Sequence, residues 1–245
     1  MKFKLAIPSL SRSELIKKHP LLKESIVCVR ETQEDMYRKA IPDADIRVMP
    51  DSVKNLGGTR NWILDNVREP GDDFLFLLDD DITAVWYLMS RKSPIITDPK
   101  YMLEVIEHTG RLAQDAKAGV FGYSHVLKPQ FRHGLTVVGL RSWVSGHAMG
   151  IVDTDLRFDE DMTTKGDFDM SLQSIVKSRL CWQDRRWHFA HEAWVTPGGQ
   201  TMFRTKDVDL QDTEYLRQKW GRSIVNAGGS RKENTRGLRL SIGVE

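Results

Sequence analysis

Short apolar runs alternate with amphipathic segments along the first eighty residues of the chain. Buried strands are expected over residues 2–7, 25–30, 45–49 and 73–78, each bounded by Pro, Ser, Asp or Arg. Helices are expected between them, up to about His19, over residues 34–41 and over residues 59–67. Strands that alternate with helices predict an α/β fold with a mostly parallel central sheet.

The pattern becomes more mixed after residue 81. Asp98 followed by Pro99 is typical of a helix N-terminus, and the apolar spacing that follows predicts a helix to about residue 117. Further helices are expected over residues 167–177 and 207–220, and extended segments over residues 120–126, 135–138, 146–152 and 180–187. The tail from Gly221 is rich in Gly, Ser and Arg and is expected to be a loop or to be ordered only by a ligand.

Three carboxylates, Asp79, Asp80 and Asp81, follow the apolar run of residues 74–78 directly. In open α/β sheets, ligands bind beyond the carboxyl ends of the strands. Adjacent acids repel one another unless a cation lies among them, and hard divalent cations are often held by one or two carboxylates and substrate phosphates. The motif favours a Mg²⁺ or Mn²⁺ site that handles a phosphorylated substrate, and the alternative is a solvated acidic loop.

Two segments of the first half could bind an anion. Gly57 and Gly58 precede a predicted helix that has Arg60 in its first turn, which suits a nucleotide, although the segment is neither a P-loop nor a dinucleotide fingerprint. Ser9 and Arg12 follow the first strand, so in a parallel sheet their loop lies beside the loop after the fourth strand. A plain turn, a helix cap and solvated arginines are the alternatives.

Two segments of the second half carry further candidate chemistry. Asp167 opens a predicted helix and is a candidate general base, with the acids at 159–161 as rivals and a structural helix cap as the alternative. His188 or His191 could complete a metal shell, and a satisfied core or surface histidine is the alternative.

The composition is that of an ordinary globular protein. The chain has 245 residues, of which 40% are hydrophobic and 29% charged, and its net charge is +2. Two cysteines, Cys28 and Cys181, cannot build a cysteine-rich zinc site or a disulfide framework. With no signal-peptide core and no apolar run long enough for a bilayer, we expect a cytoplasmic protein without a membrane partner.

Basic and aromatic residues concentrate late in the chain. The basic ones between residues 217 and 239 are Arg217, Lys219, Arg222, Arg231, Lys232, Arg236 and Arg239. Just upstream, Trp182, Trp187 and Trp194 stand among further arginines. Such mixtures suit a nucleic-acid backbone and stacked bases, and the alternative is a solvated tail with core tryptophans.

Together these segments resemble GT-A glycosyltransferases, and most of all the TET-associated glycosyltransferases of phages, relatives of the kinetoplastid base J glucosyltransferase. The resemblance covers roughly residues 2 to 200. It rests on Ile-Pro-Ser-Leu-Ser-Arg at residues 7–12, Thr-Arg-Asn at residues 59–61 and Leu-Asp-Asp-Asp-Ile at residues 78–82. Gly166-Asp167-Phe168-Asp169 is similar to the acidic motif that carries the catalytic base, although the usual Glu-Asp pair of the family reads Gly-Asp here.

The resemblance implies a single GT-A domain over residues 1–245: a nucleotide-sugar half (1–81), an acceptor and catalytic half (82–220) and a basic tail (221–245). It implies a metal-dependent transfer of sugar from a nucleotide-sugar, expected to be a UDP-sugar, to the hydroxyl of a 5-hydroxymethylpyrimidine in DNA, in the host cytoplasm if the protein is phage-encoded. Inversion through a direct displacement is expected, and a retaining route stays open.

The resemblance also assigns roles to residues. Mn²⁺ or Mg²⁺ is expected on Asp79, Asp81 and His191, and Asp167 is expected to be the base. The nucleotide-sugar is expected on Ser9, Arg12, Gly57, Arg60, Asn61 and Asp80. Other interpretations are a GT-A enzyme with a protein, glycan or small-molecule acceptor, a metal-dependent nucleotidyltransferase, and a non-catalytic nucleic-acid binder.

Overall fold

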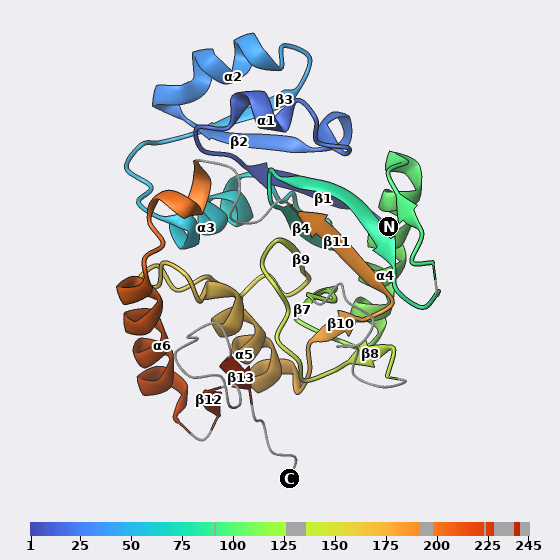
Figure 1. Ribbon diagram of the computed structural model, residues 1–245, viewed down its shortest axis with the longest axis vertical. Coiled ribbons are helices and arrows are strands. Elements are labelled where there is room, and N and C mark those ends of the chain that lie inside the picture. Colours follow the sequence, from blue (N-terminus) through green and yellow to red (C-terminus); the bar gives the residue numbers. More distant parts are fainter. Residues whose placement is uncertain (91, 126–135, 192–197, 223, 228–237, 241–245) are drawn as a thin grey trace.

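The computed structural model of the protein describes residues 1–90, 92–125, 136–191, 198–222, 224–227 and 238–240. These residues form an eight-stranded sheet with helices on both faces (Figure 1), in the strand order β3-β2-β1-β4-β9-β7-β10-β8. The expected α/β architecture with a mixed, mostly parallel central sheet is therefore confirmed.

The first half of the chain follows its apolar pattern closely. The strands β1 (Phe3–Pro8), β2 (Ile26–Arg30), β3 (Asp45–Met49) and β4 (Phe74–Leu78) pair in parallel. They are linked by α1 (Ser13–Ile16), α2 (Glu34–Ala40) and α3 (Leu56–Asn66) and by short 3₁₀ turns at Leu22–Glu24 and Glu31–Gln33. Helix α3 begins three residues earlier than expected, because Asn55 caps it.

The second half adds strands of both directions. Strand β9 (Ala148–Ile151) runs antiparallel between β4 and β7 (Val120–Tyr123), β7 pairs in parallel with β10 (Trp182–Asp184), and β8 (Val138–Gly139) runs antiparallel to β10. The helices here are α4 (Pro99–Asp115), α5 (Gly166–Ser178) and α6 (Lys206–Trp220).

Two smaller sheets were not expected. One joins β5 (Ile82–Tyr87), β6 (Ile95–Ile96) and β11 (Trp187–His191), so the extended segment expected at 180–187 is two strands of different sheets, β10 and β11. The other pairs β12 (Val225–Ala227) with β13 (Leu238–Leu240). The expectation of a loop throughout the tail from Gly221 is therefore wrong. Three-residue strands are too short to show a period, and only their mutual pairing defines them.

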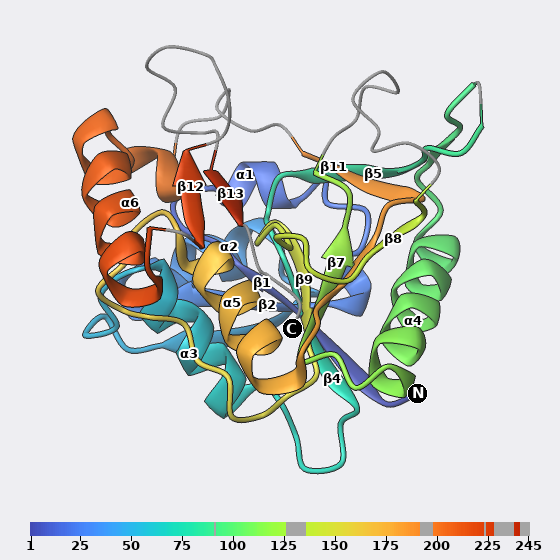
Figure 2. The ribbon, with the colours of Figure 1, turned by 90° about the horizontal axis from the view of Figure 1, so that it is seen from below.

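The pleat of the sheet divides the core into two. Leu5 and Ile7 of β1 pack in the same cluster as side chains of α1, α2 and α4, whereas Ala6 packs with side chains of α3 and α5. Figure 2 shows α4 on one side of the sheet and α3 and α5 on the other. A third cluster joins α5 to α6 through Phe168, Leu172 and Leu216. None of the helices in the described ranges has the length and hydrophobicity that a membrane crossing requires.

Candidate active site

A cleft with a volume of about 880 Å³ lies where the parallel strands end. Its walls come from the ends of β1 and β4, the first turns of α3 and α5, the segment before β9 and residues 198–204. The residues expected in the site that line it are Ser9, Arg12, Gly57, Arg60, Asp79, Asp80, Asp81, Asp167 and His191. Nearly all of the candidates chosen from sequence therefore converge on one cleft.

The three carboxylates after β4 have different surroundings. Asp80 is buried and both of its oxygens are engaged, since Oδ1 accepts from Arg12 at 2.7 Å and Oδ2 accepts from Ser9 at 2.6 Å. The guanidinium of Arg12 also lies 3.7 Å from Asp81. These contacts show that the loop after β1 does lie beside the loop after β4.

Asp79 and Asp81 are less well compensated. Desolvation raises the pKa of Asp79 to about 6, with Asp80 and Asp167 adding to the shift and Arg60 and Arg12 opposing it. Desolvation and then the charge of Asp79 raise the pKa of Asp81 to about 6. Oδ1 of Asp81 is buried and makes no hydrogen bond with the described residues. Two adjacent carboxylates with raised pKa values, one buried (Asp81) and one partly exposed (Asp79), favour binding a cation.

Strand register brings two histidines to this group. The backbone amide of Asp79 donates to the carbonyl of His147 at 2.9 Å, because β9 runs antiparallel beside β4. His191 pairs with Ile82 at the start of β5, and its ring stacks on His147 with centroids 4.4 Å apart. Burial lowers the pKa of His191, and the charge of Asp81 opposes this shift.

His188 is the weaker metal candidate of the expected pair. It is buried, it does not line the cleft, and its Nδ1 lies 2.7 Å from the carbonyl of Ser124. Within the described part of the chain, no three His, Cys, Asp or Glu side chains converge as a metal site. One or two carboxylates together with oxygens of a phosphorylated substrate are the usual arrangement for Mg²⁺.

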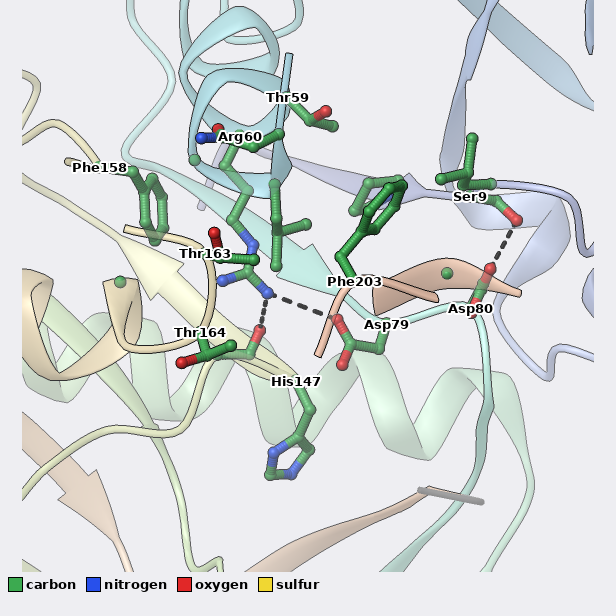
Figure 3. Close-up of a pocket in the computed structure, with 18 of the residues that line it drawn as sticks. Ser9, Thr59, Arg60, Asp79, Asp80, His147, Phe158, Thr163, Thr164 and Phe203 are labelled. Carbon is green, nitrogen blue, oxygen red and sulfur yellow. Dashed lines mark hydrogen bonds and ion pairs between the residues drawn. The ribbon is translucent and has the colours of Figure 1, made fainter. Parts of the chain in front are cut away.

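Gly146 connects the two halves of the cleft. Its amide donates to Asp167 at 3.2 Å, and its carbonyl accepts from Arg60 at 2.8 Å. The same guanidinium lies 3.5 Å from Asp79, as Figure 3 shows. A Cβ at position 146 would lie 2.7 Å from Nη1 of Arg60, so a larger residue there would displace this guanidinium. Asp167 and Asp79 are thereby held on one site through Arg60 and Gly146.

Asp167 does not cap α5. The N-cap is Lys165, and Asp167 lies in the first turn, where Oδ1 accepts from its neighbour's amide at 3.0 Å. Its two hydrogen bonds among the described residues come from backbone amides, and it lines the cleft. The structural alternative is therefore weaker for Asp167 than the sequence suggested.

The rival acids are occupied elsewhere. Asp159 accepts from Lys219 at 2.6 Å and from Tyr215 at 3.3 Å. Glu160 accepts from the amide of Asn61 at 2.9 Å. The acids at 159–161 do not line the cleft, so Asp167 is the acid between residues 159 and 169 that does.

Asn61, like His188, is an expected site residue that does not line the cleft. Its side chain donates to the carbonyl of Phe158 at 2.9 Å and accepts from the amide of the same residue at 2.8 Å. These bonds fasten the loop before α5 to helix α3. The geometry thus gives Asn61 a structural contact and no contact with the cleft.

The glycine pair in the first turn of α3, Gly57 and Gly58, also serves close packing. Asn55 accepts from the amide of Gly58 at 2.9 Å, and a Cβ on Gly57 would lie 3.0 Å from the carbonyl oxygen of Asp159. The first turn of α3 therefore lies directly on the loop before α5, and a larger residue at Gly57 would press on the backbone of that loop.

Several lining residues gave no sequence signal. They are Ser145, Gly146, His147, Thr163, Thr164 and the half-exposed Phe203, and Figure 3 shows four of them around Arg60 and Asp79. They lie in loops or at strand ends whose neighbours are distant in sequence. Only the register of β9 against β4 could have identified His147.

The late basic segment is only partly visible. Arg231, Lys232, Arg236 and Trp194 lie outside the described residues, as does the side chain of Arg239. Lys219 pairs with Asp169 at 2.9 Å, and Arg217 and Arg222 both pair with Glu214 of the same helix. These three cations are therefore engaged within the protein.

Comparison with known proteins adds one family match. The family described as TET-Associated Glycosyltransferase matches residues 3–195. Among curated proteins, none matches the chain significantly.

Solved structures resemble the chain in fold alone. A 4-diphosphocytidyl-2C-methyl-D-erythritol synthase from Anaerococcus prevotii matches with 11% identity and a TM-score of 0.43, over 88% of this chain and 96% of that one. A UDP-glucose pyrophosphorylase complexed with UDP-glucose has 9% identity, a TM-score of 0.45, and coverage of 89% and 100%. The galactosyltransferase LgtC, in complex with donor and acceptor sugar analogs, has 14% identity, a TM-score of 0.34, and coverage of 73% and 65%.

Proposed function

The chain belongs to the TET-associated glycosyltransferase family, and from that premise we propose that it moves a sugar from a nucleotide-sugar to the hydroxyl of a 5-hydroxymethylpyrimidine in DNA. The observation that carries the proposal is the cleft itself. It brings the acids after β4 and the open carboxylate of Asp167 together, with Arg60 and Gly146 between them.

The charges of the cleft favour a donor that arrives with a cation. Its described lining holds five Lys or Arg residues and five Asp residues, so it offers a diphosphate no net positive field. Arg12, Arg60 and Arg204 each already contact an acid. Mg²⁺ or Mn²⁺ on Asp79 and Asp81 would neutralise the charge that develops on the leaving nucleoside diphosphate. The unpartnered oxygen of Asp81 and the raised pKa values of both acids fit such an ion.

The two ends of the cleft suit the two parts of the donor. Toward β1 and β3 the lining mixes apolar side chains with polar ones, the apolar ones being Pro8, Leu10, Met49, Val53 and Leu56 and the polar ones Arg30, Asp51, Lys54 and Asn55. This end would take the planar nucleobase, and the charged end near Asp79 would take the diphosphate and sugar. We expect a UDP-sugar, as in the sequence-based expectation.

Asp167 is the proposed base. Its carboxylate lies in the cleft, on the other side of Gly146 from Arg60 and Asp79. The anomeric carbon of the donor would lie between these groups. It would take the proton of the acceptor hydroxyl as the oxygen attacks that carbon and the nucleoside diphosphate leaves from the opposite face. This in-line displacement inverts the configuration at the anomeric carbon.

The size of the cleft bears on how DNA would enter. A volume of 880 Å³ is that of a small-molecule site, which accommodates a nucleotide-sugar and one base but not a duplex. A 5-hydroxymethylpyrimidine would therefore have to leave the base stack to place its hydroxyl near Asp167.

The test is a transfer assay with mass-spectrometric readout. The protein, Mn²⁺ and a panel of UDP-sugars are incubated with duplex DNA containing 5-hydroxymethylcytosine, and the nucleosides are analysed after digestion. A matched duplex with unmodified cytosine is the control. A hexose or N-acetylhexosamine mass on the modified base alone is the expected result. Metal-dependent release of UDP without a mass shift on DNA would contradict the acceptor but retain the donor, and neither signal would reject both.

A further inference from the structure

Asp80 differs from the two acids beside it because a closed set of hydrogen bonds holds it. Its oxygens accept from Ser9 at 2.6 Å and from the Arg12 guanidinium at 2.7 Å. Behind Ser9 lies the hydroxyl of Tyr37, a fully buried residue of α2 that does not line the cleft. The Tyr37 oxygen is 2.7 Å from the Ser9 hydroxyl and accepts from the backbone amide of Arg12 at 3.0 Å.

The direction of each bond follows from the number of protons available. The single hydroxyl proton of Ser9 is donated to the carboxylate of Asp80, so Ser9 has none left for Tyr37. Tyr37 must therefore donate to Ser9 while it accepts from the Arg12 amide. The bonds run from the Arg12 backbone through Tyr37 and Ser9 to Asp80, and the Arg12 side chain closes the ring on the same carboxylate.

We propose that Tyr37 is a positioning residue for the donor site, which through Ser9 and Arg12 fixes Asp80 and so determines that Asp79 and Asp81 are the acids left to hold the donor with its cation. The inference rests on the proposed function, because only a donor that binds with a cation gives Asp79 and Asp81 this role.

The ring has the properties that this role requires. Ser9, Tyr37, Asp80 and the side chain of Arg12 are all buried, and hydrogen bonds that end on an ionised group in such surroundings are strong and reinforce one another. Burial raises the pKa of Tyr37, which keeps its proton in place for Ser9. Without the hydroxyl of Tyr37, the Arg12 amide loses its acceptor and Ser9 loses its donor.

The matched comparison is Tyr37→Phe against Tyr123→Phe. Tyr123 is also fully buried, and its hydroxyl donates to a backbone carbonyl, that of Val105 at 3.3 Å, away from the cleft. Tyr37→Phe loses the two hydrogen bonds of a buried hydroxyl and Tyr123→Phe loses the bond to Val105, so both unfolding temperatures should fall, that of Tyr37→Phe by more. Calorimetric titration with UDP in the presence of Mn²⁺ should show about three- to tenfold weaker binding for Tyr37→Phe, the usual range for one hydrogen bond. Tyr123→Phe should bind within about twofold of the wild type.

A double-mutant cycle adds a readout that general destabilisation would not change. If Tyr37 acts through Asp80, the loss of UDP affinity in Tyr37→Phe should shrink markedly in an Asp80→Asn background, whereas the effect of Tyr123→Phe should not change. Unaltered UDP binding by Tyr37→Phe, or additive losses with Asp80→Asn, would overturn the proposal.

A crystal structure of Tyr37→Phe separates this inference from the proposed function. A displaced Arg12 or a broken bond between Arg12 and Asp80 supports the positioning role, and an unchanged ring overturns it. If the wild-type protein binds no UDP at all, the UDP donor of the proposed function fails, and this structure alone decides whether Tyr37 positions Asp80.

Discussion

The two halves of the chain supply the cleft in different ways. In residues 1–81 the cleft residues follow parallel strands, and several of them bond to one another, as Asp80 does to Ser9 and Arg12. In the second half the cleft residues lie beside antiparallel strands or at a helix start, and Asp167 and His147 keep hydrogen-bonding capacity there. Asp167 is held by backbone amides, and Nε2 of His147 has no partner among the described residues.

The first half therefore mainly supports the site, and the second half supplies groups that can react. In the first half, Ser9, Arg12 and Asp80 form a fixed scaffold, which is what a site for a charged donor requires before the donor arrives. The second half presents groups with unused hydrogen-bonding capacity, which a reacting substrate can engage. Asp81 lies at the boundary between the two halves. It also has unused hydrogen-bonding capacity, because its buried Oδ1 has no hydrogen-bond partner within the described ranges.

The largest effect is expected at that boundary. Asp81→Ala should lower sugar transfer by about a thousandfold, because it removes a group that would hold the cation on the leaving diphosphate. The unfolding temperature should not fall, since burial of this carboxylate beside Asp79 raises its pKa and makes its ionised form costly in the folded protein. Transfer rates by nucleoside mass spectrometry and calorimetric unfolding provide the two measurements. Asp65→Ala, at a surface ion pair with Arg157, is the control, and full activity of Asp81→Ala would end the cation hypothesis.

In the second half of the chain, Asp167→Asn tests the proposed base. Turnover should fall by about 10² to 10⁴, whereas UDP affinity should stay close to that of the wild type, because a base acts in the transition state. The comparison is Asp169→Asn two residues along α5, where the fully buried carboxylate bonds to Trp220 and Gln173. That variant should lose stability with turnover per folded molecule largely retained. An equal loss of UDP binding in Asp167→Asn would make Asp167 structural.

The same contrast explains what the sequence revealed. Parallel strands place their carboxyl ends on one edge, so the meeting of Ser9 and Arg12 with Asp80 could be expected from the order of strands alone. His147 could not, because it reaches Asp79 through the register of β9 against β4, which the local pattern does not encode. Tyr37 could not either, because its role depends on a hydroxyl that points back from α2 to the end of β1.

Asn61 shows a different limit. The motif Thr-Arg-Asn at residues 59–61 assigns Asn61 to the donor together with Arg60, yet consecutive residues on a helix point about 100° apart. Arg60 therefore faces the cleft and Asn61 faces the loop at residues 158–160. A sequence motif identifies a helix that approaches a ligand, but the face of each residue comes from the packing of that helix.

The first half of the chain should also show a distinct response to acid. His19 is buried in this half, and desolvation lowers its pKa to about 4. Between the ordinary pKa of 6.5 and this value the unfolded chain binds more protons than the folded protein, so this group reduces stability as the pH falls from about 6.5 to 4. His19→Asn keeps an acceptor near the Leu21 amide and removes the titration. Urea unfolding at pH 7.5 and 4.5 should show a loss about 2–3 kcal/mol smaller in the variant than in the wild type. Equal losses of unfolding free energy in the variant and the wild type would mean that protonation of His19 does not reduce stability.

The smallest effect is expected where sequence and structure assign different roles. Asn61→Ala should lower the free energy of unfolding by about 1–2 kcal/mol, because both backbone groups of Phe158 lose their partner. UDP affinity should change less than about twofold, since the side chain does not line the cleft. Asn66→Ala on the same helix, whose amide bonds only to the carbonyl of Trp62 at the surface, should stay within about 0.5 kcal/mol of the wild type. A tenfold loss of UDP affinity in Asn61→Ala at unchanged stability would restore Asn61 to the donor site and move the boundary between scaffold and ligand contacts into α3.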